Sequence, residues 1–150
     1  MSSSTSSIKT IGTVYKKKNQ EGDFEWHIKS GLYEDSLFLF NDDEKRNKWK
    51  KAGMGNAVIR KYNKYALKKP RSCGIITGKD VGYSELTDEV KKIIDRCFDE
   101  VKDIIRTYGY KRVYYSAQTP NGLLGTSIFK VGDDVISYIT SQIKALELEY

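Results

Sequence analysis

One long amphipathic segment constrains the fold of this chain more than any other part of the sequence. Between Thr87 and Tyr108 apolar residues recur at steps of three and four, which keeps them on one helical stripe for about five turns. The apolar segments 73–76 and 112–116 precede and follow it. Because so apolar a stripe must be covered, the spacing predicts a strand–helix–strand unit over residues 72–117, with its helix packed on a sheet.

Further segments around this unit predict a single compact α/β domain over residues 8–150, with at least two amphipathic helices packed on a mixed sheet. Residues 36–40 form a continuous apolar run, which is typical of a strand buried on both faces. A last helix is expected after Gly132, where two acidic residues suit an N-terminus. Residues 1–7 are too polar to pack and are predicted to be a disordered leader.

The N-terminal part of the domain is predicted to form a β-hairpin. Residues 8–15 and 24–28 are β-prone, and a polar loop with a glycine near its end joins them. In the second segment apolar and polar residues alternate, so His27 is expected on the wet side, as a surface residue rather than a catalytic base. Residues 57–67 fit either a helix or a strand, and the sequence leaves both open.

Composition excludes several classes of protein. No apolar run approaches the roughly 20 residues that span a bilayer, so no membrane partner is expected. The Ser-rich start lacks the apolar core of a secretory signal. Cys73 and Cys97 fall at apolar positions, which predicts buried thiols in a reducing, cytoplasmic compartment. Two cysteines and the single histidine are too few for a zinc site, so neither a metal nor a cofactor is predicted.

The net charge of +6 is concentrated in one tract. Residues 45–69 contain no acidic residue, so this tract could meet a polyanion such as nucleic acid, or simply form a solvated basic face. Its cationic residues are Lys45, Arg46, Lys48, Lys50, Lys51, Arg60, Lys61, Lys64, Lys68 and Lys69.

Four loops combine polar residues with glycines or follow predicted strands. In an open α/β sheet, ligands bind beyond the carboxyl ends of the strands, and glycine loops there expose N–H groups to anions. These loops therefore predict a site for a phosphorylated ligand, although tight turns would also explain the glycines. They contain Asn41 and Asp42; Gly53, Gly55 and Asn56; Thr77, Gly78, Lys79 and Asp80; and Ser116 with Gly125 and Thr126.

Sharper motifs are absent. The segment 74–80 is one residue too short for a P-loop and lacks the hydroxyl residue after its lysine. The glycines at 53 and 55 have no third glycine at the dinucleotide-fold spacing. No Gly-x-Ser-x-Gly elbow is present, and no second histidine is available for a hydrolytic triad.

The order of the loops resembles a shortened macro domain. The resemblance covers residues 36–117: an apolar strand ending at Asn41, a glycine loop running into residues 53–59, and a strand ending in Thr77-Gly78 before a helix. Macro domains bind ADP-ribose and related NAD-derived nucleotides, and some hydrolyse ADP-ribosyl bonds. The resemblance thus implies a nucleotide ligand for this chain, held and sequestered at the strand ends.

The resemblance also implies roles for individual residues. Asn41 or Asp42 would lie near the adenosine or distal ribose, the loop from Gly53 to Asn56 would line the distal ribose, and Thr77-Gly78 would cradle the pyrophosphate. With such a nucleotide bound, the backbone amides of Gly55, Gly78 and Gly125 would contact phosphate, and Lys79 or Arg60 would balance its charge.

Two other functions compete with nucleotide binding. One is hydrolysis of a nucleotide or ADP-ribosyl bond, with Asp42 or Asp80 as general base; such work needs a carboxylate in a closed cleft. The other is nucleic-acid binding through residues 45–69, which predicts an affinity that falls steeply with salt. Oligomeric state is left open by the sequence.

Overall fold

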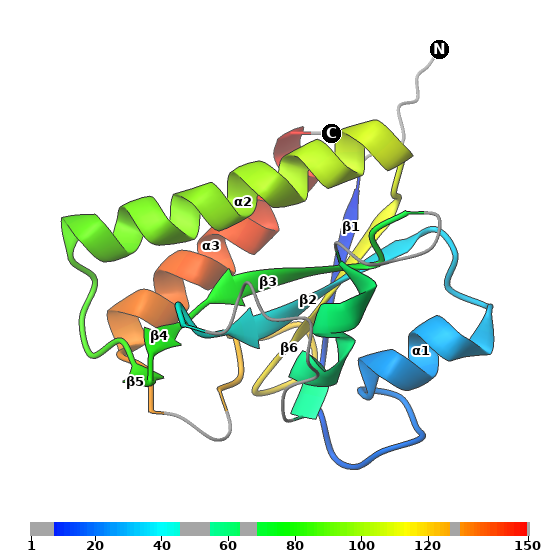
Figure 1. The fold of residues 1–150 in the computed structure, drawn as a ribbon, viewed down its shortest axis with the longest axis horizontal. Helices are drawn as coiled ribbons and strands as arrows, with labels where there is room; N and C mark the ends of the chain where they lie inside the picture. Colours follow the sequence, from blue (N-terminus) through cyan, green and yellow to red (C-terminus); the bar gives the residue numbers. More distant parts are fainter. Residues whose placement is uncertain (1–7, 46–54, 64–68, 127–129, 150) are drawn as a thin grey trace.

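Four parallel strands form the central sheet of the computed structural model, which describes residues 8–45, 55–63, 69–126 and 130–149 (Figure 1). In spatial order they are β1 (Lys9–Thr13), β6 (Arg112–Ser116), β2 (Ser36–Asp42) and β3 (Ser72–Ile76). Strand β2 lies between β3 and β6, so the strand–helix–strand unit predicted over residues 72–117 crosses over one strand. The predicted α/β fold class is confirmed.

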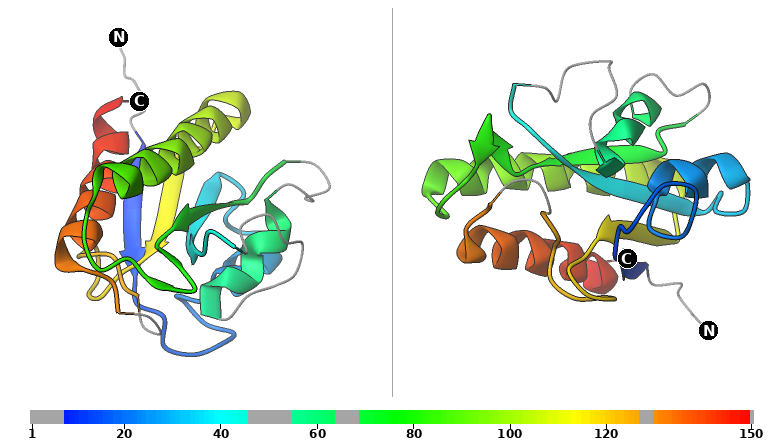
Figure 2. Two further views of the ribbon diagram at one scale, coloured as in Figure 1. Left: turned by 60° about the vertical axis from the view of Figure 1, so that its left-hand side comes forward. Right: turned by 90° about the horizontal axis from the view of Figure 1, so that it is seen from below.

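Helices cover both faces of this sheet and make a three-layer domain (Figure 2). On one face lie α2 (Asp88–Tyr108) and α3 (Asp133–Glu149). On the other lie α1 (Phe24–Ser30) and η1, a 3-10 helix (Gly55–Tyr62). A separate antiparallel ladder, β4 (Gly78–Lys79) with β5 (Val81–Gly82), follows β3.

Helix α2 has the ends that its sequence predicts. The Thr87 side chain accepts a hydrogen bond from the Val90 amide, at 3.2 Å, and caps the N-terminus. Gly109 ends the helix in the left-handed conformation, with φ of 71°, and donates its N–H to the Ile105 carbonyl at 2.8 Å. The spacing of apolar residues is confirmed over most of the stripe, whereas Tyr108, at its end, is 42% exposed.

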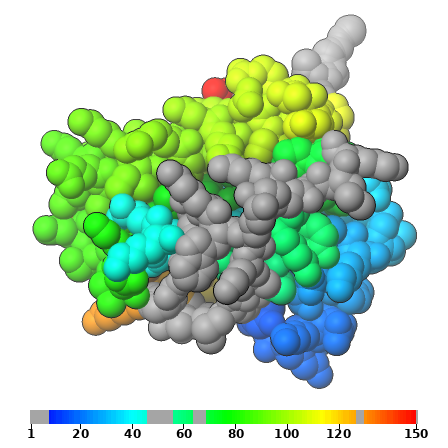
Figure 3. Space-filling view, in the orientation of Figure 1, coloured from blue at the N-terminus to red at the C-terminus, as the bar shows by residue number. Residues whose placement is uncertain are grey.

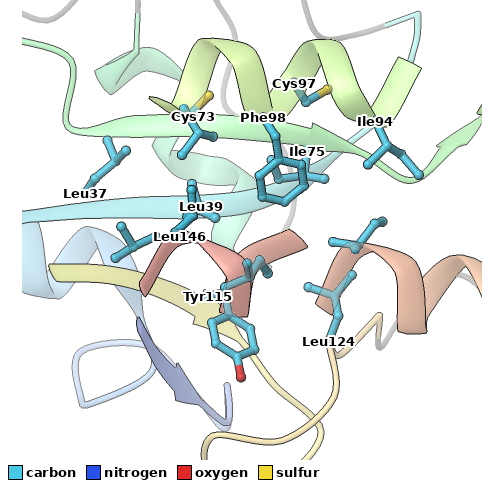
Figure 4. Packing of buried hydrophobic residues seen from close by; sticks show 14 of the residues in the cluster. Leu37, Leu39, Cys73, Ile75, Ile94, Cys97, Phe98, Tyr115, Leu124 and Leu146 are labelled. Atoms are coloured by element: carbon cyan, nitrogen blue, oxygen red, sulfur yellow. The ribbon is translucent and has the colours of Figure 1, made fainter. Parts of the chain in front are cut away.

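The larger apolar core lies between the sheet and helices α2 and α3 (Figure 4). Phe98 and Ile94 of α2 pack there with Leu39 of β2 and Ile75 of β3. Each such side chain contributes about 1.5–3 kcal/mol when it is fully buried, so this face supplies most of the apolar stabilisation. Cys73 and Cys97 belong to the same cluster, which confirms that both thiols are buried.

A smaller, aromatic core fills the opposite face. Phe24 of α1 packs on Phe38, with ring centroids 5.2 Å apart, and Phe38 stacks on Tyr114 at 5.0 Å. Ile59 of η1 completes this cluster and is fully buried. The two short helices therefore depend on contacts with the sheet, since helices of this length are unstable alone.

The predicted N-terminal hairpin is wrong. Residues 8–15 do contain strand β1, but residues 24–28 lie in α1, and β1 pairs with β6 in parallel. The Asp23 side chain caps this helix by accepting from the Glu25 amide, and Gly31 ends it with φ of 75°. A five-residue alternation fits a strand or one turn of helix equally, and these two caps decide for the helix.

Two related expectations also need correction. His27 is 1% exposed, because on a helix it lies on the same side as Phe24, three residues earlier, and faces the sheet. The main sheet is not mixed, since all its pairings are parallel and the antiparallel ladder stands apart from it.

Other expectations have simpler outcomes. Residues 57–67, which fit either a helix or a strand in the sequence, begin within η1. The helix predicted after Gly132 is confirmed as α3. The predicted leader, residues 1–7, lies outside the described residues. Within the described ranges, no helix is both long enough and apolar enough to cross a bilayer.

Replacing the capping Thr87 with alanine should destabilise the protein by about 1 kcal/mol, because one N-terminal amide of α2 loses its acceptor. Urea unfolding measures this free energy. Thr107, exposed in the last turn of the same helix, is the matched control, and its replacement with alanine should change the free energy by less than about 0.5 kcal/mol. Equal effects of the two substitutions would contradict the assigned cap.

Candidate functional site

The carboxyl ends of all four main strands meet at one edge of the sheet, because the strands are parallel. They end at Thr13, Asp42, Ile76 and Ser116. From β1 and β2 the chain continues into α1 and η1 on one face, whereas from β3 and β6 it continues into α2 and α3 on the other. Neighbouring strands thus send their connections to opposite faces, which is the position where open α/β sheets bind ligands.

The loop after β6 folds back over this edge. Asn41, at the end of β2, donates its side-chain amide to the Gly125 carbonyl at 2.7 Å. Gly125 in turn donates its N–H to the Ser116 carbonyl at 3.0 Å. Two of the four predicted loops are therefore in direct contact, and the Gly125 amide expected to meet phosphate already has an acceptor.

Asn56 connects the third loop to the same edge. Its Oδ1 accepts from the Phe24 amide at 2.8 Å, and its Nδ2 donates to the Gly22 carbonyl at 2.9 Å and to Ser116 Oγ at 2.7 Å. The residue is 9% exposed. One buried side chain thus joins the start of α1, the start of η1 and the end of β6.

A buried ion pair lies next to this network. Arg60 Nη2 contacts Asp42 Oδ1 at 2.6 Å, and the two side chains are only 6% and 2% exposed. Gly74 of β3 makes room for the pair, because a Cβ there would come within 2.8 Å of Asp42 Oδ2. The arginine also lies 5.9 Å from the centre of the Phe40 ring. Asp42 is therefore engaged as an ion-pair partner.

The fourth loop makes a tight turn beside the end of β2. Thr77 donates its N–H to the Asp42 carbonyl at 3.0 Å, which extends the β2–β3 ladder. A Cβ on Gly78 would lie 2.2 Å from the Val81 carbonyl oxygen, so the turn itself requires this glycine. Asp80 adopts a positive φ of 66° and donates its N–H to Asp43 Oδ2 at 2.6 Å.

The segment after β2 lies against this turn (Figure 3). Glu44 donates its N–H to the Gly78 carbonyl at 2.9 Å and accepts from the Tyr83 hydroxyl at 2.6 Å. Burial and this carboxylate raise the pKa of Tyr83 well above its usual value. Lys45 pairs with Asp80 across the same contact. The β4–β5 turn is thus fixed by acidic residues of the neighbouring loop.

Thr13 lies at the same edge and is a candidate site residue that sequence reasoning missed. It ends β1 opposite Ser116 in the parallel register, and it is 7% exposed. Its hydroxyl is buried and has no hydrogen-bond partner in the described part of the chain. A buried polar atom without a partner is uncommon and calls for an explanation. The available signal was a hydroxyl residue within the β-prone segment 8–15, two positions before its predicted end.

The predicted site residues therefore divide into three groups. Asn41, Asn56, Ser116 and Gly125 form one hydrogen-bonded network, which the Asp42–Arg60 pair and Thr77 border. Gly78, Lys79 and Asp80 belong to the β4–β5 turn, where Lys79 is exposed. Gly55 begins η1, Thr126 is half-buried after the network, and Gly53 lies outside the described residues.

Thiol and metal chemistry find no support in the described residues. Burial raises the pKa of Cys97 to about 11 and also raises the pKa of Cys73 well above its usual value, so both thiols stay protonated at neutral pH. No group of three or more metal-binding side chains gathers within the described ranges.

Comparison of the chain with models of protein families, with curated proteins and with solved structures gave no match. The function must therefore be argued from the geometry of this edge.

A double-mutant cycle tests the buried ion pair. Arg60→Met and Asp42→Asn should each destabilise the protein by about 3–5 kcal/mol, because each leaves a buried charge without its partner. The double variant should cost at least about 1 kcal/mol less than the sum of the single variants. Chemical denaturation gives all three values, and strict additivity would contradict a direct pair.

Asn56→Ala should destabilise the protein by about 2–4 kcal/mol, because the Phe24 amide and the Gly22 carbonyl lose their partner in a buried place. Ser116→Ala is the matched comparison, since it removes only one of the three hydrogen bonds of Asn56 and should cost about 1 kcal/mol. Thermal unfolding of the two variants measures the difference. A smaller effect of Asn56→Ala than of Ser116→Ala would contradict the connecting role of Asn56.

Proposed function

We propose that this protein binds a phosphorylated nucleotide, of the ADP-ribose or NAD-derived kind, at the carboxyl edge of its sheet. The observation that carries the proposal is the convergence of three of the predicted loops on one network beside a strand-order reversal, through Asn41, Asn56, Ser116 and Gly125. The resemblance of these loops to those of macro domains supports a ligand of this kind.

Charge at the helix ends favours one part of this edge over another. The first turn of α2 carries Asp88 and Glu89, and that of α3 carries Asp133 and Asp134. Asp134 already accepts from the Leu86 and Val135 amides. Acidic side chains at a helix N-terminus use the favourable potential that would otherwise attract phosphate. The ends of β1, β6 and β2 are therefore the more favourable place for the phosphate of the proposed ligand.

Thr13 supports the same end of the edge. Its buried hydroxyl has no partner within the described ranges, and the residue pairs in register with Ser116, whose own hydroxyl accepts from Asn56. A ribose hydroxyl or a phosphate oxygen would satisfy it. Ligand binding would then remove an unfavourable feature of the free protein, which adds to affinity.

Valine at position 13 should lower the affinity for ADP-ribose about five- to tenfold, because it keeps the shape of threonine and removes only the hydroxyl. Stability should not fall and should rise slightly, since the buried hydroxyl has no partner to lose and its unfavourable burial is removed. Thr10→Val on the same strand is the control: it removes the hydrogen bond from the Thr10 hydroxyl to Glu147 of α3 but keeps the one from the Thr10 N–H, so it should lower stability and leave affinity unchanged.

Calorimetric titration with ADP-ribose, NAD, AMP and ribose 5-phosphate measures these affinities, and urea unfolding measures the stabilities. The absence of heat with every one of these compounds at high micromolar concentration would refute the proposal. If the wild-type protein and Thr13→Val bound ADP-ribose with equal affinity, the ligand could not lie against Thr13 at the end of β1.

Hydrolysis of the bound nucleotide is the alternative function for this site. Of the two candidate bases, Asp42 is buried against Arg60, and Asp80 is about half exposed and paired with Lys45. A general base must be within reach of the proton that it removes. Mass spectrometry of ADP-ribose after incubation with the protein separates the two functions: intact ligand indicates binding alone, and cleaved ligand indicates an enzyme.

Nucleic-acid binding through residues 45–69 has weaker support, and much of that tract lies outside the described residues. Its described lysines have partners elsewhere in the fold: Lys45 pairs with Asp80, Lys61 pairs with Glu25, and Lys69 lies over the Tyr110 ring. The described cations thus make intramolecular contacts that a polyanion would have to replace.

A further inference from the structure

His27 occupies an unusual environment on the aromatic face of the sheet. Its Nε2 accepts the Gly22 N–H at 3.2 Å, which requires the neutral ring with its proton on Nδ1. Nδ1 is buried without a partner in the described part of the chain. Aromatic rings surround the imidazole, at centroid distances of 4.5–6.0 Å, from Phe24, Trp26, Tyr33, Phe38 and Tyr114.

A proton on Nε2 would break this arrangement. The ring nitrogen would become a donor facing the Gly22 N–H, which is also a donor, and a charge would be buried among apolar rings. Burial is the largest influence and lowers the pKa of His27, against the carboxylates of Glu21 and Asp23, which raise it. Protonation therefore requires that the ring leave its place.

Charged groups on the neighbouring elements do not offset this penalty. Around the rings that pack on His27, Arg71 lies over Phe38 at 5.9 Å and donates to the Tyr33 carbonyl, while Arg112 pairs with Asp35. On α1 itself, Glu25 is shared by Lys29 and Lys61. The two arginines would repel a charged imidazole. Asp35 and Glu25, the acids among these groups, already have cationic partners.

The backbone contact of His27 leads directly to the candidate site. Gly22 donates its N–H to His27, and its carbonyl accepts a hydrogen bond from Asn56 Nδ2. Asn56 Oδ1 also accepts from the Phe24 amide. The same asparagine donates to Ser116 Oγ at the carboxyl edge. Residues 22–24 are thus fixed from one side by His27 and from the other by Asn56.

We propose that His27 is an acid-sensitive latch: its protonation releases residues 22–24 and loosens the hold of Asn56 on Ser116 at the ligand edge. This inference goes beyond the proposed function, because the opening is a property of the free protein and its readout needs no ligand. Acid favours the open state, because the ring is solvated there and can bind a proton.

The size of the effect follows from proton linkage. An exposed histidine has a pKa of about 6.5, and the folded ring binds its proton only at lower pH. The open state therefore gains protons first as the pH falls below about 6.5, and the closed state is fully favoured only above it. Between pH 7.5 and pH 5.5 the population of the open state should rise up to about tenfold.

Amide hydrogen exchange followed by NMR tests the latch directly. Protection factors, corrected for the pH dependence of intrinsic exchange, are measured at pH 7.5 and pH 5.5. The Phe24 amide, which donates to Asn56, should lose up to about tenfold in protection at the lower pH. The Gly109 amide, which donates to Ile105 in α2, should keep its protection because it lies on the other face of the sheet.

Two variants complete the experiment. His27→Gln keeps a side-chain acceptor for Gly22 but does not titrate, so its Phe24 protection should be the same at both pH values. His27→Phe keeps an aromatic ring at this position and has no nitrogen to protonate, so its Phe24 protection should also be independent of pH. It serves if the glutamine variant does not fold. An unchanged wild-type protection factor, an equal loss at Gly109, or the same loss in a folded variant would each overturn the latch.

Discussion

The layer formed by α1 and η1 depends on the three hydrogen bonds of Asn56. Helix α1 has seven residues and η1 is a single 3-10 element, and neither length is stable in isolation. Their apolar contact with the sheet is a small aromatic cluster. A buried side chain that joins the start of both elements to Ser116 therefore determines where they sit. Each buried polar group in this junction would be costly without its partner.

This dependence gives the two faces of the sheet different physical characters. Helices α2 and α3 bury long apolar stripes, so their face is held by many non-directional contacts. The opposite face is held by an asparagine, a histidine and the Asp42–Arg60 pair, each of which needs a defined geometry. Local opening is easiest where few apolar contacts must be broken. The candidate ligand edge borders this more polar face.

The sequence predicted the elements whose pattern is long and missed those whose pattern is short. Twenty-one residues of α2 repeat one stripe many times, and its caps agree with it, so helix and boundaries were both predictable. In residues 24–28 the alternation of a strand and the spacing of a helix coincide. The decision came from Asp23 and Gly31, which cap the ends. His27 then changed from a surface residue to a buried one because the period changed.

The candidate site was predictable in its outline and not in its bonding. Parallel strands bring their carboxyl ends together, so Asn41, Asn56 and Ser116 could be expected at one edge. Which of their polar atoms are used within the fold depends on contacts between residues far apart in the chain. Asn41 and Gly125, for example, are 84 positions apart. A sequence pattern records residue types and spacing, and it does not record such pairings.

These pairings change what each residue can offer a ligand. An atom that already has a good partner must lose it before it can bind anything, so its net contribution to affinity is small. The Gly125 amide and the oxygen and amide nitrogen of Asn56 are of this kind. The Thr13 hydroxyl has no partner among the described residues, so a ligand that reached it would have no existing hydrogen bond to displace. Asn56 therefore holds the edge in shape, whereas in the proposed function the recognition of the ligand would fall to groups without a partner, such as the Thr13 hydroxyl.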